Sequence, residues 1–147
     1  MEVLSLLKIK GMKFPLDRKY YIKNGAHIWL KSEGNIIKIG IDAFAADAIG
    51  YINFFNINKK KVKSGEDIGS FESTKFVGRF YSPINGEIVT VNNEVLSNPQ
   101  MISNNPYDSW IVAIKPNNKN KFKYILEEKD EISNWISKEI KKMEGDK

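Results

Sequence analysis

Short runs of alternating apolar and polar residues occupy most of the chain between residues 20 and 116. A period of two is typical of strands that bury one face. It predicts strands at 20–22, 27–31, 36–41, 51–56, 87–91 and 110–114, and two more within residues 71–86. The last two meet at a four-residue tip that carries Lys75. In the run 51–56, alternation predicts that Phe54 shares a face with Ile52, opposite Phe55.

One internal segment and the tail follow a helical pattern instead. Asp42 is a favourable N-cap, residues 43–49 are rich in alanine, and Gly50 suits the position after a helix, which predicts a short helix at 43–49. From residue 117 onward, two apolar groups at helical spacing predict a helical pair packed on the strands: Phe122, Ile125 and Leu126, then Ile132, Trp135, Ile136 and Ile140. A partner-binding helix is the alternative interpretation of this tail.

These elements predict a mainly β protein, a small barrel or sandwich with helices attached. We expect residues 1–19 to be an N-terminal extension in which Pro15 interrupts any regular element. Residues 20–116 form the barrel domain, and residues 117–147 form a C-terminal helical segment packed on it. The length of 147 residues suits one such domain.

Composition narrows the chemistry. The chain has no cysteine, which excludes disulfides, thiolate nucleophiles and cysteine zinc sites, and its single histidine, His27, excludes a metal site that needs two imidazoles. The net charge of +5 is mostly scattered, and its one dense cluster, residues 59–63, is typical of a solvated turn, with an anion-docking patch as the alternative. The apolar N-terminus is too short for a signal peptide or a membrane helix. We therefore expect a cytoplasmic protein without nucleic-acid or membrane partners.

The segment Glu72-Ser73-Thr74-Lys75, followed by Ser82-Pro83-Ile84-Asn85-Gly86, resembles the lipoyl-attachment region of the glycine cleavage H-protein family. Two further segments resemble the same family in order, one at residues 40–50 and one at residues 96–110. The resemblance covers roughly residues 20–126. A biotin carrier is disfavoured, because Thr74-Lys75-Phe76 replaces the methionines that usually flank a biotinylated lysine.

The resemblance implies a barrel-sandwich hybrid of the biotinyl/lipoyl type, with lipoic acid amide-linked to Lys75. Glu72, Ser73 and Thr74 would form the attachment hairpin. The protein would be a carrier rather than an enzyme, with no catalytic residue and no metal, and we expect a monomer. Its partners would be a lipoate ligase or lipoyl transferase and the enzymes that load and unload the arm. A tethered arm raises the local concentration of its cargo at each partner.

Two positions depart from the H-protein pattern. Ile28 stands where the family has the glutamate that holds the aminomethyl-loaded arm, and Arg79 stands where it has an aspartate. A protonated amine prefers anionic or neutral acceptors. The departures resemble the lipoate-binding proteins of the sulfur-oxidising heterodisulfide-reductase-like pathway, which implies a sulfur intermediate as cargo. The alternatives are a glycine cleavage H protein and a regulatory or binding barrel that is never lipoylated.

His27 has two interpretations. It either lines the cleft into which the loaded arm folds, together with Ile28 and Arg79, or is a partly buried structural residue beside Trp29.

Overall fold

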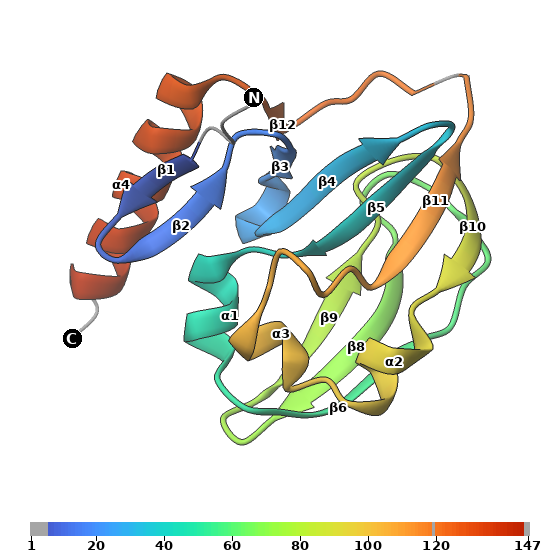
Figure 1. Cartoon of the computed structure of the whole chain (residues 1–147), viewed down its shortest axis with the longest axis horizontal. Helices are drawn as coiled ribbons and strands as arrows, with labels where there is room; N and C mark the ends of the chain where they lie inside the picture. The colour runs from blue at the N-terminus through green and yellow to red at the C-terminus, as the bar shows by residue number, and fades with distance from the viewer. Residues whose placement is uncertain (1–5, 119, 146–147) are drawn as a thin grey trace, which may run out of the picture.

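Two antiparallel sheets and a separate hairpin build the molecule, of which this computed structural model describes residues 6–118 and 120–145 (Figure 1). The seven-stranded sheet has the order β12 (Ile125–Leu126), β3 (Lys19–Tyr21), β4 (Ile28–Glu33), β5 (Ile36–Ile41), β11 (Val112–Pro116), β10 (Gly86–Val91) and β7 (Lys61–Val62). The three-stranded sheet has the order β6 (Ile52–Ile57), β8 (Asp67–Ser73) and β9 (Val77–Tyr81). The hairpin pairs β1 (Leu6–Ile9) with β2 (Met12–Pro15).

The helices are short except for the last one. They are the 3-10 turn η1 (Lys23–Gly25), α1 (Ala43–Ile49), α2 (Asn93–Ser97), α3 (Met101–Asn104) and α4 (Lys129–Gly145). The predicted fold class, a mainly β barrel-sandwich hybrid with an internal helix, is confirmed. The predicted strands at 20–22, 27–31, 36–41, 87–91 and 110–114 are found with small shifts at their ends.

The main core combines side chains from both sheets and from the segments that connect them. Isoleucine dominates it, and four of its fully buried members are Ile39, Ile68, Ile84 and Ile114. Burying one such side chain stabilises the fold by roughly 1.5–3 kcal/mol. The hydrophobic alternation along the strands therefore fixes which face of each sheet turns inward.

A second apolar cluster joins the two chain ends to the outside of the seven-stranded sheet. Phe14 from β2, Tyr20 and Trp29 from β3 and β4, and Ile132 and Ile136 from α4 are all buried in it. Figure 1 shows α4 and the β1–β2 hairpin side by side next to this part of the sheet. The predicted apolar stripe of residues 132–140 is thus the face by which α4 docks.

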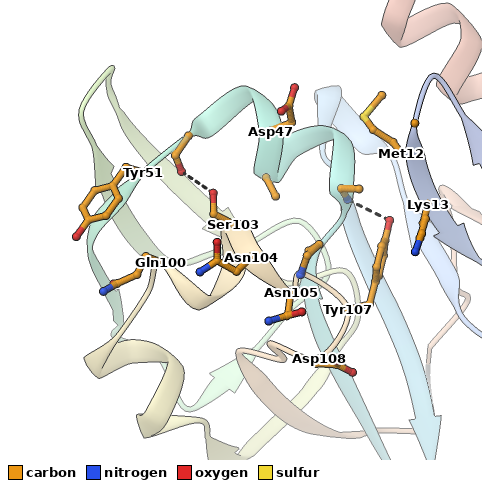
Figure 2. A pocket seen from close by; sticks show the side chains of 15 residues that line it. Met12, Lys13, Asp47, Tyr51, Gln100, Ser103, Asn104, Asn105, Tyr107 and Asp108 are labelled. Carbon is orange, nitrogen blue, oxygen red and sulfur yellow. Dashed lines mark hydrogen bonds between the residues drawn. The ribbon is translucent and has the colours of Figure 1, made fainter.

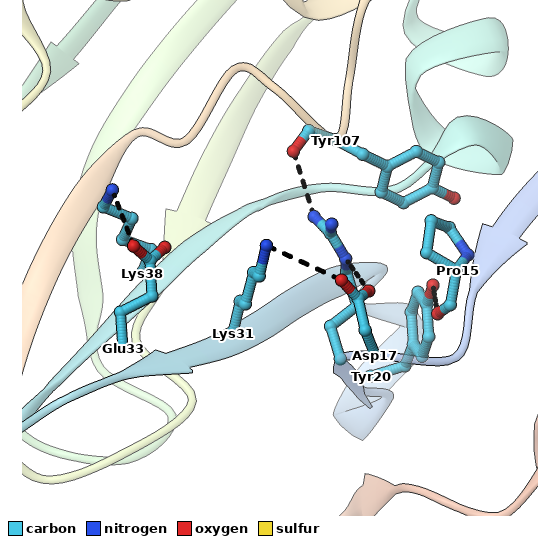
Figure 3. Close-up of polar contacts among 8 residues, drawn as sticks. Pro15, Asp17, Tyr20, Lys31, Glu33, Lys38 and Tyr107 are labelled. Carbon is cyan, nitrogen blue, oxygen red and sulfur yellow. Dashed lines mark hydrogen bonds and ion pairs between the residues drawn. The ribbon is translucent and has the colours of Figure 1, made fainter. Parts of the chain in front are cut away.

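A buried arginine, Arg18, ties the loop of residues 105–108 to the sheet, and Figure 3 shows Asp17, Lys31 and Tyr107 in this region. Arg18 donates from Nε to Oδ1 of Asp17 at 3.0 Å and from a terminal nitrogen to the carbonyl oxygen of Tyr107 at 3.0 Å. Its guanidinium lies 4.7 Å from the ring centroid of Trp29 and 5.2 Å from that of Tyr107. Burial would raise the pKa of Asp17, but hydrogen bonds and charges from Arg18 and Lys31 hold it below its ordinary value.

Three predictions about local structure are wrong. Pro15 does not prevent regular structure before residue 19, because it ends β2, where a missing amide hydrogen is tolerated. The described part of the tail, residues 117–118 and 120–145, contains one helix rather than two. Phe122 and Tyr124 have positive φ angles of 48° and 62°, and residues 125–126 form β12 beside β3.

The third wrong prediction concerns the faces of β6. A β-bulge between Ile52 and Phe54 shifts the register, so that Ile52 and Phe55 are buried while Phe54 is exposed. The strict alternation expected for residues 51–56 does not hold across that bulge.

The short helix is as predicted. Asp42 caps α1 by accepting a hydrogen bond from the amide of Ala45 at 2.9 Å, and Gly50 follows the helix with a φ of 77°. The left-handed region suits glycine, since a Cβ would be strained there.

Candidate functional site

Lys75 lies in the turn between β8 and β9, which holds three residues rather than the four expected, Thr74 to Phe76. The lysine is exposed, and within the described part of the chain no carboxylate pairs with its ammonium group. Figure 1 shows the turn at the lower edge of the molecule, away from α4. The amine is therefore presented to solvent on a two-stranded support.

Ser73 organises this turn. Its hydroxyl oxygen accepts hydrogen bonds from the amides of Lys75 at 3.1 Å and Phe76 at 3.2 Å, and its own amide donates to the carbonyl oxygen of Phe76 at 2.9 Å. Serine at the start of a turn supports it in this way. The amide of Thr74 donates to the carbonyl oxygen of Tyr51 at 3.3 Å, which attaches the turn to the neighbouring segment. Glu72 lies on β8 with its side chain exposed.

The side chain of Lys75 runs past the end of α1. A Cβ placed on Gly50 would lie 3.8 Å from Cε and 4.0 Å from Nζ of the lysine. Beside Gly50 begins a groove of about 760 Å³, here called the α1–α3 groove, which is shown in Figure 2. The polar residues that line this groove include three amides and three charged side chains: Gln100, Asn104, Asn105, Lys13, Asp47 and Asp108.

A second cleft, of about 300 Å³ and here called the β9 cleft, borders the hairpin at Phe71 of β8 and at residues 79–81 of β9. Its lining residues come from β9, from the connection between β3 and β4, and from α1, and they include His27, Ile28 and Arg79. The three residues predicted to line a cleft near the arm thus lie together. The cleft floor is apolar, with Ile28, Ile49 and Phe80 all buried.

The charge of the β9 cleft is positive. Lys23 and Arg79 line it, and among the described residues no aspartate or glutamate does so. Arg79 lies 3.5 Å from Oδ2 of Asp67, a pair that is largely exposed and so only weakly coupled. Ile28 contributes a methyl-bearing surface and no hydrogen-bonding group. The cleft therefore favours an apolar arm and disfavours a cationic end group.

His27 lines the cleft, is largely buried and is held by four neighbours. Its Nδ1 is 2.9 Å from Oδ2 of Asp42, and its Nε2 is 3.1 Å from Oε1 of Glu139. The rings of Phe44 and Trp135 stack on its two faces, each with a centroid distance of 4.5 Å. Burial opposes protonation, but the two carboxylates outweigh it and raise the pKa of His27 above 6.5. Both ring nitrogens donate in the protonated form, which fits this arrangement.

Sequence reasoning missed these partners of His27. Of its two interpretations, the structural one placed Trp29 beside the ring, whereas Trp135 stacks there, and Glu139 is 112 positions away along the chain. The helical stripe of residues 132–140 was the only available signal. Nothing in the sequence links that stripe to one particular strand.

Known proteins resemble this chain over most of its length. The family model described as glycine cleavage H-protein matches residues 18–139. A relative from Sulfurisphaera tokodaii, "Probable glycine cleavage system H protein 3", is 38% identical over 113 residues, which covers 74% of this chain and 80% of the relative. "Glycine cleavage system H protein" from Leptospira biflexa is 41% identical over 101 residues, which covers 67% of this chain and 76% of the relative.

The chain belongs to the glycine cleavage H-protein family. A solved structure supports the assignment, since the H protein from Mycobacterium marinum matches with a TM-score of 0.63 at 30% identity, over 71% of this chain and 87% of that one. H proteins carry covalently attached lipoate, and this chain is a lipoyl carrier of that type. The described residues fit the cofactor, because an exposed, unpaired amine at a supported turn is what amide attachment requires.

Two further observations on this member of the H-protein family concern membrane-spanning helices and metal sites. Within residues 6–118 and 120–145, no helix is long and apolar enough to cross a membrane. The same residues contain no group of three or more histidine, aspartate or glutamate side chains placed to hold a metal ion.

Proposed function

We propose that Lys75 bears the lipoyl group and that the chain carries the aminomethyl group of glycine between glycine cleavage enzymes. The observation that carries the attachment is the unpaired amine at the tip of the β8–β9 hairpin. The relatives named above support the cargo, since their names place them in the glycine cleavage system. When bound, lipoate supplies a long flexible arm that ends in two sulfur atoms able to hold a cargo covalently.

The chain's own residues position Lys75 and shelter the lipoyl arm. Ser73 holds the turn so that the lysine leaves it in one direction. The β9 cleft offers buried apolar surface to the arm, and Ile28 and Phe80 would exclude water from the part that enters. No residue of the chain needs to act as a catalytic acid or base. The chain would therefore act as a shuttle for other enzymes. In this proposal it is a cytoplasmic monomer and receives lipoate from a lipoate ligase or lipoyl transferase.

A second candidate cargo is a sulfur intermediate delivered to a heterodisulfide-reductase-like complex. The observation that favours it is the charge of the β9 cleft, which has Lys23 and Arg79 but no carboxylate among the lining residues that the structure describes. An anionic end group would gain from Arg79, whereas an ammonium group would be repelled. Because Arg79 is largely exposed and shares Asp67, this preference is modest.

The attachment is tested with a purified lipoate ligase, lipoate and ATP. We expect the intact mass to rise by one lipoyl group, and Lys75→Arg to abolish the rise. Lys60→Arg is the matched control, since Lys60 is also an exposed turn lysine. An unmodified wild-type protein, or modification that survives Lys75→Arg, would refute the attachment.

The cargo is tested by presenting the lipoylated protein to a glycine decarboxylase with labelled glycine. Loading of label onto the arm supports the aminomethyl cargo, and Arg79→Asp is expected to increase it, with Arg79→Gln as the control for loss of the cation alone. Arg79 suits this test because it is exposed, whereas Ile28 is part of the main core and Ile28→Glu would also destabilise the fold. Absence of label from wild type and from Arg79→Asp, with lipoylation intact, favours the sulfur cargo.

A further inference from the structure

Exposed apolar side chains gather around the attachment turn. Four of the ten large hydrophobic residues that are exposed in the described part of the chain flank Lys75: Tyr51 at 55% exposure, Phe54 at 50%, Phe76 at 46% and Val77 at 67%. These four residues are called the tip patch below. Single exposed hydrophobic residues are ordinary, but several of them close to one functional residue mark an interaction surface.

The strand register places the tip patch. Glu72 on β8 pairs with Phe54 on β6 and with Val77 on β9, so the three side chains form one row across the three-stranded sheet. Residues directly opposite in antiparallel strands point to the same face. The bulge that breaks the alternation of β6 is what turns Phe54 outward into this row. The local irregularity thus builds an exposed apolar pair, with one carboxylate between its members.

Tyr51 and Phe76 bring the patch to the lysine itself. The carbonyl oxygen of Tyr51 accepts from the amide of Thr74, and Phe76 is the residue after Lys75. Tyr51 also lines the α1–α3 groove, where Figure 2 shows its ring pointing away from α1. The ring of Phe76 lies 6.2 Å from that of the buried Phe71, on the face of the hairpin opposite Phe54 and Val77. The patch therefore has members on both faces of the hairpin that carries Lys75, and Tyr51 extends it to a polar groove.

We propose that the tip patch is the docking surface for the enzyme that acylates Lys75, a ligase that holds lipoyl adenylate; the proposal rests on the proposed attachment at that residue. Two kinds of partner enzyme bind this protein, and they differ in how far from Lys75 their chemistry takes place. Enzymes that load or unload cargo react at the far end of the arm and can dock away from its base. The acylating enzyme must bring its bound adenylate to bonding distance of Nζ, so its surface necessarily covers the residues that flank Lys75.

The acylation step defines what the contact must achieve. The neutral amine of Lys75 forms a bond with the carbonyl carbon of lipoyl adenylate, and the bond between that carbon and the phosphate oxygen breaks. AMP leaves, and its phosphate takes the proton that the amine loses. This reaction needs an active site closed to water, because water would hydrolyse the adenylate. Apolar side chains near the lysine suit such closure, and they fit an apolar interface core on the enzyme.

The test compares two double variants. Phe54→Ser with Val77→Ser removes the outward pair of the tip patch, and Val89→Ser with Phe122→Ser removes a matched pair, exposed at 48% and 46%, outside the patch. Lipoylation by a purified lipoate ligase is followed by intact mass at several carrier concentrations. Affinity of each unmodified carrier for the adenylate-loaded ligase is measured in parallel in a Lys75→Arg background, where no transfer occurs.

The tip-patch variant is expected to raise the KM for the carrier and the Kd by about tenfold, with kcat within about twofold of wild type, because the lost contacts bind rather than react. The matched variant should resemble wild type. Tyr51→Ser, tested alone, should also raise the KM for the carrier. It replaces the double variant as the test if that variant is unfolded at the assay temperature. Equal KM and Kd for both double variants would overturn the proposal while leaving the attachment intact.

Two other outcomes also decide. A wild-type protein that the ligase does not modify would overturn the attachment and with it this proposal. A concentration-dependent dimer that Phe54→Ser with Val77→Ser dissociates, with lipoylation unchanged, would overturn the ligase as occupant and assign the patch to a second copy of the chain.

Discussion

His27→Phe separates the two kinds of contact that hold His27, and its effect can be worked out from the structure. Phenylalanine keeps the stacking between Phe44 and Trp135 but removes both hydrogen bonds and the positive charge. Asp42, which is fully buried, would keep only the Ala45 amide as a partner. Glu139, which is partly buried, would keep Lys142 at 3.6 Å.

The expected loss is about 3 kcal/mol, the lower end of the range for breaking a buried ion pair, because Glu139 can turn toward solvent. For a chain of this size that corresponds to a fall in Tm of about 6–12 °C. Glu87→Gln is the control, since it removes an exposed ion pair with Lys60 and should cost less than about 1 kcal/mol.

The loss should also depend on pH. The pKa of His27 is higher in the folded than in the unfolded protein, so its stabilisation is complete below the unfolded value of about 6.5 and is lost as pH rises through the folded pKa. Urea unfolding of wild type and His27→Phe is measured across this window. The difference in unfolding free energy should shrink as pH rises. A difference that stays constant or grows with pH, or a variant as stable as wild type, would refute the claim that protonated His27 stabilises the fold through Asp42 and Glu139.

Two further predictions concern the hairpin. Gly78→Ala should destabilise the protein by about 1–3 kcal/mol through overpacking, because a Cβ there would lie 2.2 Å from Cζ of Phe71. The control Gly145→Ala, whose Cβ would have nothing within 4 Å, should leave urea unfolding unchanged, and equal stability of the two variants would contradict this packing. Ser73→Ala should remove about 1 kcal/mol of hydrogen bonding from the turn, so that the amide hydrogens of Lys75 and Phe76 exchange about fivefold faster when measured by NMR. Unchanged exchange rates would show that the hydroxyl does not hold the turn.

Local chemistry made several elements predictable from the sequence. Asp42 and Gly50 bracket the only alanine-rich segment, and both perform the cap roles that their residue types favour. The strands on either side of Lys75 follow from alternation, and the attachment residues follow from a resemblance that the family match supports.

Long-range geometry was not predictable in the same way. The bulge in β6 inserts no unusual residue, yet it reverses the exposure of Phe54, because register depends on the partner strand rather than on the local sequence. The positive φ angles of Phe122 and Tyr124 break a spacing that otherwise fits a helix. The contact between His27 and α4 joins residues 112 positions apart, and only packing decides it.

The central claim is that Lys75 carries the lipoyl group, and the most direct test is the tryptic peptide map of the protein isolated from its own cells. Between Lys63 and Arg79 the sequence offers trypsin one site, Lys75, and an amide on that lysine blocks cleavage. The account predicts an uncleaved peptide from Ser64 to Arg79 that is heavier by one lipoyl group. Cleavage after an unmodified Lys75 throughout the sample, or a lipoyl group on another residue, would contradict it.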